Sequence, residues 1–135
     1  MDHFNYFSND WISYFKTKIK GTVLNIFLNK KILIYGLGKS GLASFKFLKN
    51  KSDIFLYDDY PLKIKSLDIK KRLINYKNIL KLNFDQIILS PGIDINKCKL
   101  SKYLKKNHSK IYSDLDVFYS FFKNESITIT GTNGK

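Results

Sequence analysis

The sequence predicts an α/β protein built on a Rossmann-like, doubly wound and mostly parallel sheet. Short apolar runs of β-branched and aromatic residues alternate with stretches of helical spacing, which is typical of consecutive β-α-β units. The strongest runs are apolar throughout, as strands buried on both faces must be. Glycine turns follow three of the runs, and this order places the turns at the carboxyl edge of the sheet, where ligands of such folds bind.

The first half of the predicted sheet starts at residue 31. The run Lys31–Tyr35 is continuously apolar and predicts a buried strand, and Leu42–Leu48 carries its apolar residues on one helical face. Ile54–Tyr57 predicts the second strand. Pro61 then breaks the chain, and the lysine-rich stretch up to about Arg72 predicts a helix.

The second half begins with an ambiguous stretch, 73–82, that fits neither period. Gln86–Leu89 (QIIL) predicts a short strand that ends at a Ser-Pro-Gly turn. Lys97–Asn107 has helical spacing, and Lys110–Tyr112 predicts a further short strand. Asp114 is then expected to cap a helix whose apolar residues are Leu115, Phe118, Tyr119 and Phe122.

A last β-branched strand, Ile127–Thr130, leads into a glycine loop. We therefore expect three regions: an N-terminal extension (1–30), a Rossmann-like domain (31–124), and the first strand and phosphate loop of a truncated ATP-binding domain (125–135). Because a stable domain would not finish inside such a loop, we expect the sequence to be part of a longer one.

The formal net charge of +13 raises the possibility of nucleic-acid binding, with 24 basic against 11 acidic residues. Only Arg72 is an arginine, and the lysines are spread along the chain in pairs. Neither a recognition helix nor an aromatic RNA-binding motif is present. A solvated surface explains the charge better, and we expect acidic small molecules as partners and no nucleic acid.

Cysteine content and hydropathy bear on the cell compartment. The single cysteine, Cys98, excludes a disulfide framework within the chain and suits a reducing cytoplasm. No apolar stretch approaches the roughly 20 residues needed to cross a bilayer. We expect no integral membrane segment.

The first 30 residues differ from the rest. Aromatic and aliphatic residues recur there at three- and four-residue steps, which predicts an amphipathic helix. They are Phe4, Phe7, Trp11, Ile12, Phe15 and Ile19. This helix could lie on a membrane surface or pack on the following domain; the second alternative is favoured, because it requires no special function.

The turn from Gly36 to Gly41 (GLGKSG) fits the G-x-G-x-x-G pattern between a strand and a helix. Gly36 permits the tight turn, Gly38 lets phosphate approach the backbone, and Gly41 lets the helix pack on the strand. Asp58 ends the second strand, where an acid that binds ribose is expected. Alone, this pattern would indicate a nicotinamide or flavin cofactor, so an NAD(P)-binding oxidoreductase or regulatory module remains an alternative.

The chain ends on a loop typical of phosphate binding: Gly131, Thr132, Asn133, Gly134 and Lys135. Consecutive backbone N–H groups in such a loop cradle phosphate oxygens, and the lysine neutralises charge on the β- and γ-phosphates. The loop departs from the common form because Ile129 stands where the first glycine would be. The hydroxyl residue that would hold Mg²⁺ is expected after Lys135.

Taken in order, these motifs resemble the UDP-N-acetylmuramoyl-L-alanine:D-glutamate ligase (MurD) family of Mur ligases. The resemblance rests on G-L-G-x-S-G-x-A from Gly36, on Tyr57-Asp58-Asp59, on L-S-P-G-I before Asp94, and on I-T-G-T-N-G-K ending at Lys135. It extends from about residue 31 to 135 and leaves residues 1–30 outside.

The resemblance implies a first domain that holds the UDP part of UDP-N-acetylmuramoyl-L-alanine and not NAD. By position, the UDP-binding residues would be Lys39, Ser40, Asp58, Asp59 and Gly92, and the loop Gly131–Lys135 would bind ATP. The implied reaction adds D-glutamate through an acyl phosphate with ATP and Mg²⁺, in a cytoplasmic monomer. We expect the 135-residue chain by itself to lack ligase activity, because the metal ligands and the D-glutamate site of the family lie further along.

Overall fold

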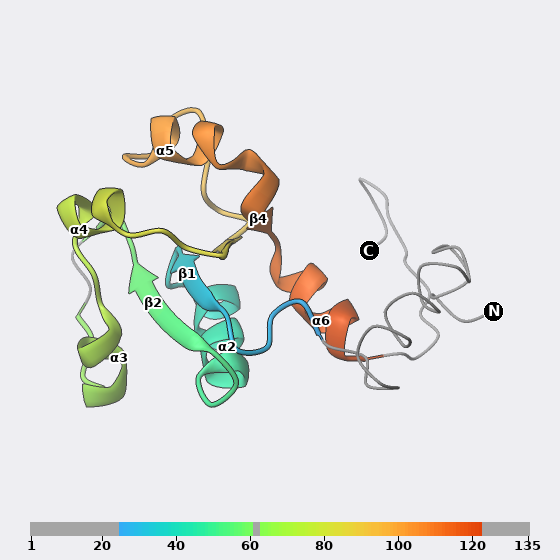
Figure 1. Ribbon diagram of the computed structural model, residues 1–135. Helices are drawn as coiled ribbons and strands as arrows, with labels where there is room; N and C mark the ends of the chain where they lie inside the picture. The colour runs from blue at the N-terminus through green and yellow to red at the C-terminus, as the bar shows by residue number, and fades with distance from the viewer. Residues whose placement is uncertain (1–24, 61–62, 123–135) are drawn as a thin grey trace, which may run out of the picture.

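The computed structural model describes residues 25–60 and 63–122 (Figure 1). Its strands are β1 (Lys31–Tyr35), β2 (Asp53–Tyr57), β3 (Gln86–Leu89) and β4 (Ile111–Tyr112). Its α-helices are α2 (Lys39–Leu48), α3 (Leu67–Arg72), α4 (Tyr76–Lys81), α5 (Ser101–Lys106) and α6 (Asp114–Phe121), with a 3₁₀ turn η2 at His108–Lys110. The predicted N-terminal amphipathic helix, the last strand and the glycine loop at 131–135 lie outside the described residues.

The four described strands form one parallel sheet in the order β2-β1-β3-β4. Ile32 pairs with Ile54 on one side and with Gln86 on the other, and Ile87 pairs with Ile111. Since every pairing is parallel, each strand returns through a crossover on one face of the sheet. This confirms the predicted α/β class and the strands that precede the glycine turn 36–41, Asp58 and the Ser-Pro-Gly turn.

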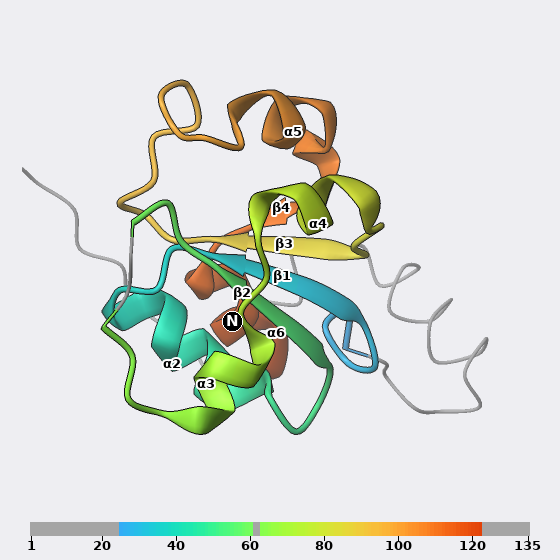
Figure 2. The same cartoon turned by 90° about the vertical axis from the view of Figure 1, so that its left-hand side faces the viewer.

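Side chains of the central strand alternate between two cores, as the two-residue period of a strand requires. Ile32 and Ile34 are buried with residues of α2 and α6, whereas Leu33 and Tyr35 are buried with residues of α4 and α5. Figure 2 shows the resulting layers, with α2, α3 and α6 below the sheet and α4 and α5 above it. Burial on both faces explains why β1 and β3 are apolar apart from their first residues, Lys31 and Gln86.

Helix α2 starts directly after the first glycine turn, with Gly38 as its N-cap residue. It begins three residues earlier than the apolar spacing predicts, because Lys39 and Ser40 are helical but polar. Phe45 and Leu48 are buried against the sheet. The amino end of α2 therefore lies at the carboxyl edge of the sheet, next to the end of β1.

The N-cap residue of α6 is Ser113, so the predicted cap at Asp114 is wrong. The Ser113 hydroxyl accepts a hydrogen bond from the Asp116 amide, and the Asp116 carboxylate accepts one from the Ser113 amide. The Asp114 carboxylate accepts a hydrogen bond from α2 instead. The buried residue of α6 is Val117, at 3% exposure, whereas Leu115 and Phe118 are 61% and 50% exposed.

Candidate functional site

The ends of three strands bring the predicted motifs together. Tyr35 is paired with Tyr57 on β2 and with Leu89 on β3, so the residues that follow these three lie side by side. We call this region the carboxyl edge; it comprises the turns 36–41, 58–60 and 90–93. Glycine turns, an acid pair and a Ser-Pro-Gly turn that are far apart in sequence thus meet at one place.

The first turn at the carboxyl edge is packed too closely for side chains at two of its glycines. Gly36 has a φ of 96°, and a Cβ there would lie 2.7 Å from the Ser90 Cβ. A Cβ on Gly41 would lie 1.8 Å from the Gly36 carbonyl oxygen, which is backbone and cannot rotate away. Gly36 is therefore required for the tight turn and Gly41 for packing of α2 on β1, which are the roles that the sequence predicts.

Gly38 has a different role, because no described atom lies within 4 Å of the position that its Cβ would take. Among the described residues no side chain caps α2, and its first turn holds no acidic residue. The first N–H groups of a helix have no acceptor inside the helix and carry partial positive charge. Open space in front of such a helix end is suited to an anionic group such as phosphate.

Asp58 lies against this turn, as an acid at the end of β2 should. Its Oδ2 accepts a 2.8 Å hydrogen bond from the Leu37 amide, and its Oδ1 accepts one of 3.1 Å from the Tyr60 amide. A carboxylate oxygen can accept more than one hydrogen bond, so both remain able to accept another from a ligand. Asp58 is half-buried and in contact with the glycine turn.

Asp59 is hydrogen-bonded to residues on the side of the sheet that α4 and α5 cover. Its Oδ1 accepts a 2.7 Å hydrogen bond from the Tyr35 hydroxyl, and its Oδ2 accepts one of 3.1 Å from the Lys99 amide. Burial raises the pKa of the Tyr35 hydroxyl far above its usual range, and the hydrogen bond to Asp59 acts in the same direction. Tyr35 therefore remains a proton donor to Asp59 at any ordinary pH.

Lys39 and Ser40 occupy the first turn of α2. Lys39 is exposed, and the Ser40 hydroxyl donates a 2.5 Å hydrogen bond to the Asp114 carboxylate at the start of α6. Because the hydroxyl hydrogen of Ser40 is used in this bond, the backbone amide of Ser40 is the group that can donate a hydrogen bond to a ligand. The sequence interpretation did not assign Asp114 to the site, although its place two residues after β4 puts it at the same edge.

The Ser-Pro-Gly turn after β3 is hydrogen-bonded to the end of β1 and to the glycine turn 36–41. The Ser90 amide donates to the Tyr35 carbonyl at 3.0 Å, and its buried hydroxyl donates to the Gly36 carbonyl at 2.7 Å. Gly92 is exposed, and no described atom lies within 4 Å of the place that a Cβ would occupy there. Ser90 thus has a packing role that the sequence did not predict, while Gly92 leaves its backbone accessible.

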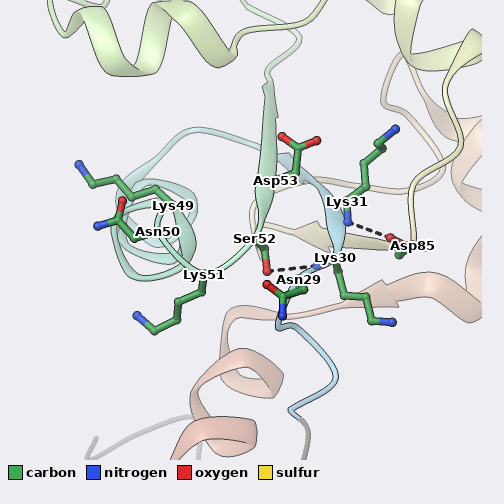
Figure 3. Close-up of a pocket in the computed structure, with 9 residues that line it drawn as sticks. All are labelled: Asn29, Lys30, Lys31, Lys49, Asn50, Lys51, Ser52, Asp53 and Asp85. Carbon is green, nitrogen blue, oxygen red and sulfur yellow. Dashed lines mark hydrogen bonds between the residues drawn. The ribbon is translucent and has the colours of Figure 1, made fainter.

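A shallow hollow of about 530 Å³ lies at the opposite, amino edge of the sheet (Figure 3). Its lysines point away from one another, and two of them have partners: Lys49 pairs with Asp68, and Lys51 donates to the Phe47 carbonyl. The carboxylates of Asp53 and Asp85 add negative charge. Because α2 presents its carboxyl end here, with partial negative charge, this hollow suits an anion less well than the carboxyl edge does.

The described residues also set limits on other kinds of site. Across 25–60 and 63–122, no three His, Cys, Asp or Glu residues are grouped so that they could hold a metal ion. Within the same residues, no helix is both long enough and apolar enough to cross a membrane.

Comparison with known proteins gives one family. The model for the Mur ligase MurD-like N-terminal domain matches residues 30–111. The UDP-N-acetylmuramoylalanine--D-glutamate ligase of Rickettsia prowazekii is 37% identical over 119 residues, which cover 83% of this chain and 26% of that enzyme. The enzyme of the same name from Rickettsia conorii is 38% identical over 119 residues, covering 83% and 23%.

A relative from another genus gives a similar match. The ligase of the same name from Lachnoclostridium phytofermentans is 34% identical over 119 residues, covering 81% of this chain and 26% of that enzyme. The chain thus spans about a quarter of the length of the curated relatives that it matches. No solved structure matches significantly.

Proposed function

Because the chain belongs to the MurD-like N-terminal domain family of Mur ligases, we propose that its carboxyl edge binds the UDP part of UDP-N-acetylmuramoyl-L-alanine. The diphosphate would lie in the open space at Gly38, on the first N–H groups of α2, which include those of Lys39 and Ser40. Asp58 would accept hydrogen bonds from the ribose or the uracil, and the accessible backbone at Gly92 would face the diphosphate.

One observation carries this proposal: the contrast between the three glycines of the first turn. Gly36 and Gly41 have no room for a side chain because the protein itself fills the space, whereas no atom of the described residues fills the space at Gly38. Packing accounts for the first two and does not account for the third. A ligand that must approach the backbone at Gly38 would account for it.

For the longer protein we propose ATP-dependent addition of D-glutamate to the bound UDP-sugar. ATP would phosphorylate the alanyl carboxylate, the D-glutamate amine would attack the acyl phosphate, and phosphate would leave as the amide forms. The loop Gly131–Lys135 would hold the ATP phosphates, with Lys135 offsetting charge on the transferring group. Mg²⁺, when bound, would offset negative charge on the phosphates, and the hydroxyl residue expected after Lys135 would help to hold it. We place this reaction in the cytoplasm, in a monomeric enzyme.

Calorimetric titration of the chain with UDP-N-acetylmuramoyl-L-alanine and, separately, with NAD⁺ tests the binding proposal. We expect saturable binding of the UDP-sugar and no heat from NAD⁺. Asp58→Asn should weaken UDP binding about tenfold, the equivalent of one charge-assisted hydrogen bond. The matched control is Asp53→Asn, since Asp53 is exposed at the opposite edge. Binding of NAD⁺ in preference to the UDP-sugar would instead favour the oxidoreductase or regulatory module.

A further inference from the structure

Asp59 is the point where two distant segments join the loop after β2. The Tyr35 hydroxyl, on β1, and the Lys99 amide, in the segment before α5, each donate to one carboxylate oxygen of Asp59. The Lys99 ammonium donates in addition to the Asp59 carbonyl oxygen at 2.8 Å. Three hydrogen bonds therefore hold one residue, and they involve both its side chain and its backbone.

The position of Tyr35 makes this connection rigid. Its side chain is fully buried, and the Tyr57 ring packs on it with centroids 5.1 Å apart. Its hydroxyl needs an acceptor, because a buried polar group without a partner is costly. Asp59 provides that acceptor, so a movement of the loop after β2 would cost the Tyr35 hydroxyl its hydrogen bond to a carboxylate.

The two neighbouring aspartates thus face different parts of the molecule. The partners of Asp58 are amides of the glycine turn and of its own loop, at Leu37 and Tyr60. The partners of Asp59 are on the side of α5. Of the two aspartates, only Asp58 is hydrogen-bonded to the glycine turn that precedes α2.

We propose that Tyr35, Asp59 and Lys99 are positioning residues of the nucleotide site: they fix the loop 58–60 so that Asp58 meets the nucleotide, and Asp59 itself makes no ligand contact. The inference rests on the proposed function, and it revises the role that the family resemblance implies for Asp59. The Lys99 ammonium acts through the Asp59 carbonyl, whereas the Lys99 amide and the Tyr35 hydroxyl act through the Asp59 carboxylate.

Amide hydrogen exchange of the ligand-free chain, followed by NMR, tests the network without depending on UDP binding. The probe is the buried Leu37 amide, because it is bonded to Asp58 and lies on a different segment from the variants. Lys99→Ala should speed its exchange severalfold, up to about tenfold, the equivalent of one hydrogen bond. Lys99→Arg, which keeps a donor, should restore slow exchange. Lys97→Ala is the matched control, since Lys97 is 86% exposed.

Titration of the same variants with UDP completes the test. We expect Lys99→Ala and Tyr35→Phe to weaken UDP binding severalfold and in proportion to the faster exchange at Leu37, with Lys99→Arg close to the wild type. Unchanged exchange in Lys99→Ala would overturn the network, because that exposed substitution leaves the fold intact. Weaker UDP binding by Asp59→Asn with unchanged exchange would also overturn the proposal, because Asp59 would then be a direct contact. Absence of UDP binding by the wild-type chain would refute the proposed function and, with it, the positioning role, whatever the exchange rates show.

Discussion

Replacement of Gly41 by alanine should destabilise the domain strongly, whereas the same change at Gly38 should not. The new Cβ of Gly41→Ala would lie 1.8 Å from the Gly36 carbonyl oxygen, roughly 1.5 Å closer than an ordinary van der Waals contact. Since that oxygen belongs to the backbone, α2 must shift away from β1. The shift also strains the 2.7 Å hydrogen bond that the Gly36 carbonyl accepts from Ser90.

The expected magnitude follows from these two effects. Overpacking costs about 1–3 kcal/mol when side chains can adjust, and the rigid backbone here places the cost at the upper end. Loss of the Ser90 hydrogen bond adds about 1 kcal/mol. We therefore expect Gly41→Ala to lower the free energy of unfolding by about 3–4 kcal/mol.

Gly38→Ala is the matched comparison. Gly38 has a φ of −74°, which any residue adopts, and no described atom lies near the new methyl group. Its stability should remain within about 1 kcal/mol of the wild type, because a small entropic gain and a poorer N-cap offset each other. Its affinity for UDP should fall at least about tenfold, because the methyl group fills the approach to the helix end.

Urea denaturation followed by far-ultraviolet circular dichroism measures both stabilities, and calorimetry measures the affinity. A Gly41→Ala protein as stable as the wild type would refute the described packing of α2 on the turn. A Gly38→Ala protein that is stable and binds UDP normally would refute the assignment of the open space at Gly38 to the ligand.

Two further predictions concern buried polar groups at the carboxyl edge. Ser90→Ala should lower the free energy of unfolding by about 1–2 kcal/mol, because it removes the hydroxyl that donates to the Gly36 carbonyl. The control is Ser109→Ala, since Ser109 is exposed. Urea denaturation curves of Ser90→Ala and the wild type that coincide would contradict this prediction. Burial raises the pKa of Tyr57 to about 12, so the unfolded chain loses that proton first and stability should fall as pH rises from about 10 through 12. Tyr57→Phe should make this fall less steep in pH-dependent denaturation, with the rest contributed by Tyr35, whose pKa is also raised; an unchanged slope would contradict the prediction.

Much of the fold follows from local patterns because its strands are buried on both faces. Lys31–Tyr35 and Gln86–Leu89 are confirmed with the predicted bounds, since most of their residues are buried and, apart from Gln86, the buried ones are apolar. Helix α4 is ambiguous in the sequence for the opposite reason: Ile79 is its only buried residue, so little periodicity marks it. In α6 the apolar spacing predicts that Leu115 and Phe118 lie on the buried face, but both are exposed and Val117 is the buried residue.

The candidate site was also predictable only in part. The glycine turn and Asp58 could be predicted because a strand end, a turn and a helix start are adjacent in sequence. The partners of Asp59 could not, because Tyr35 and Lys99 are 24 and 40 residues away and meet it only through the packing of the sheet. The bond between Ser40 and Asp114 spans 74 residues and depends on how α6 packs on α2.

The central claim, that the carboxyl edge holds the UDP moiety, is tested most directly by mapping UDP-induced changes in amide chemical shifts of the isotopically labelled chain. We expect the largest changes at the first turn of α2, from Gly38 to Ser40, with further changes at Asp58 and Gly92. The residues around the amino-edge hollow, such as Lys30 and Asp85, should not change. Changes confined to that hollow, or none at the glycine turn at saturating UDP, would contradict the claim.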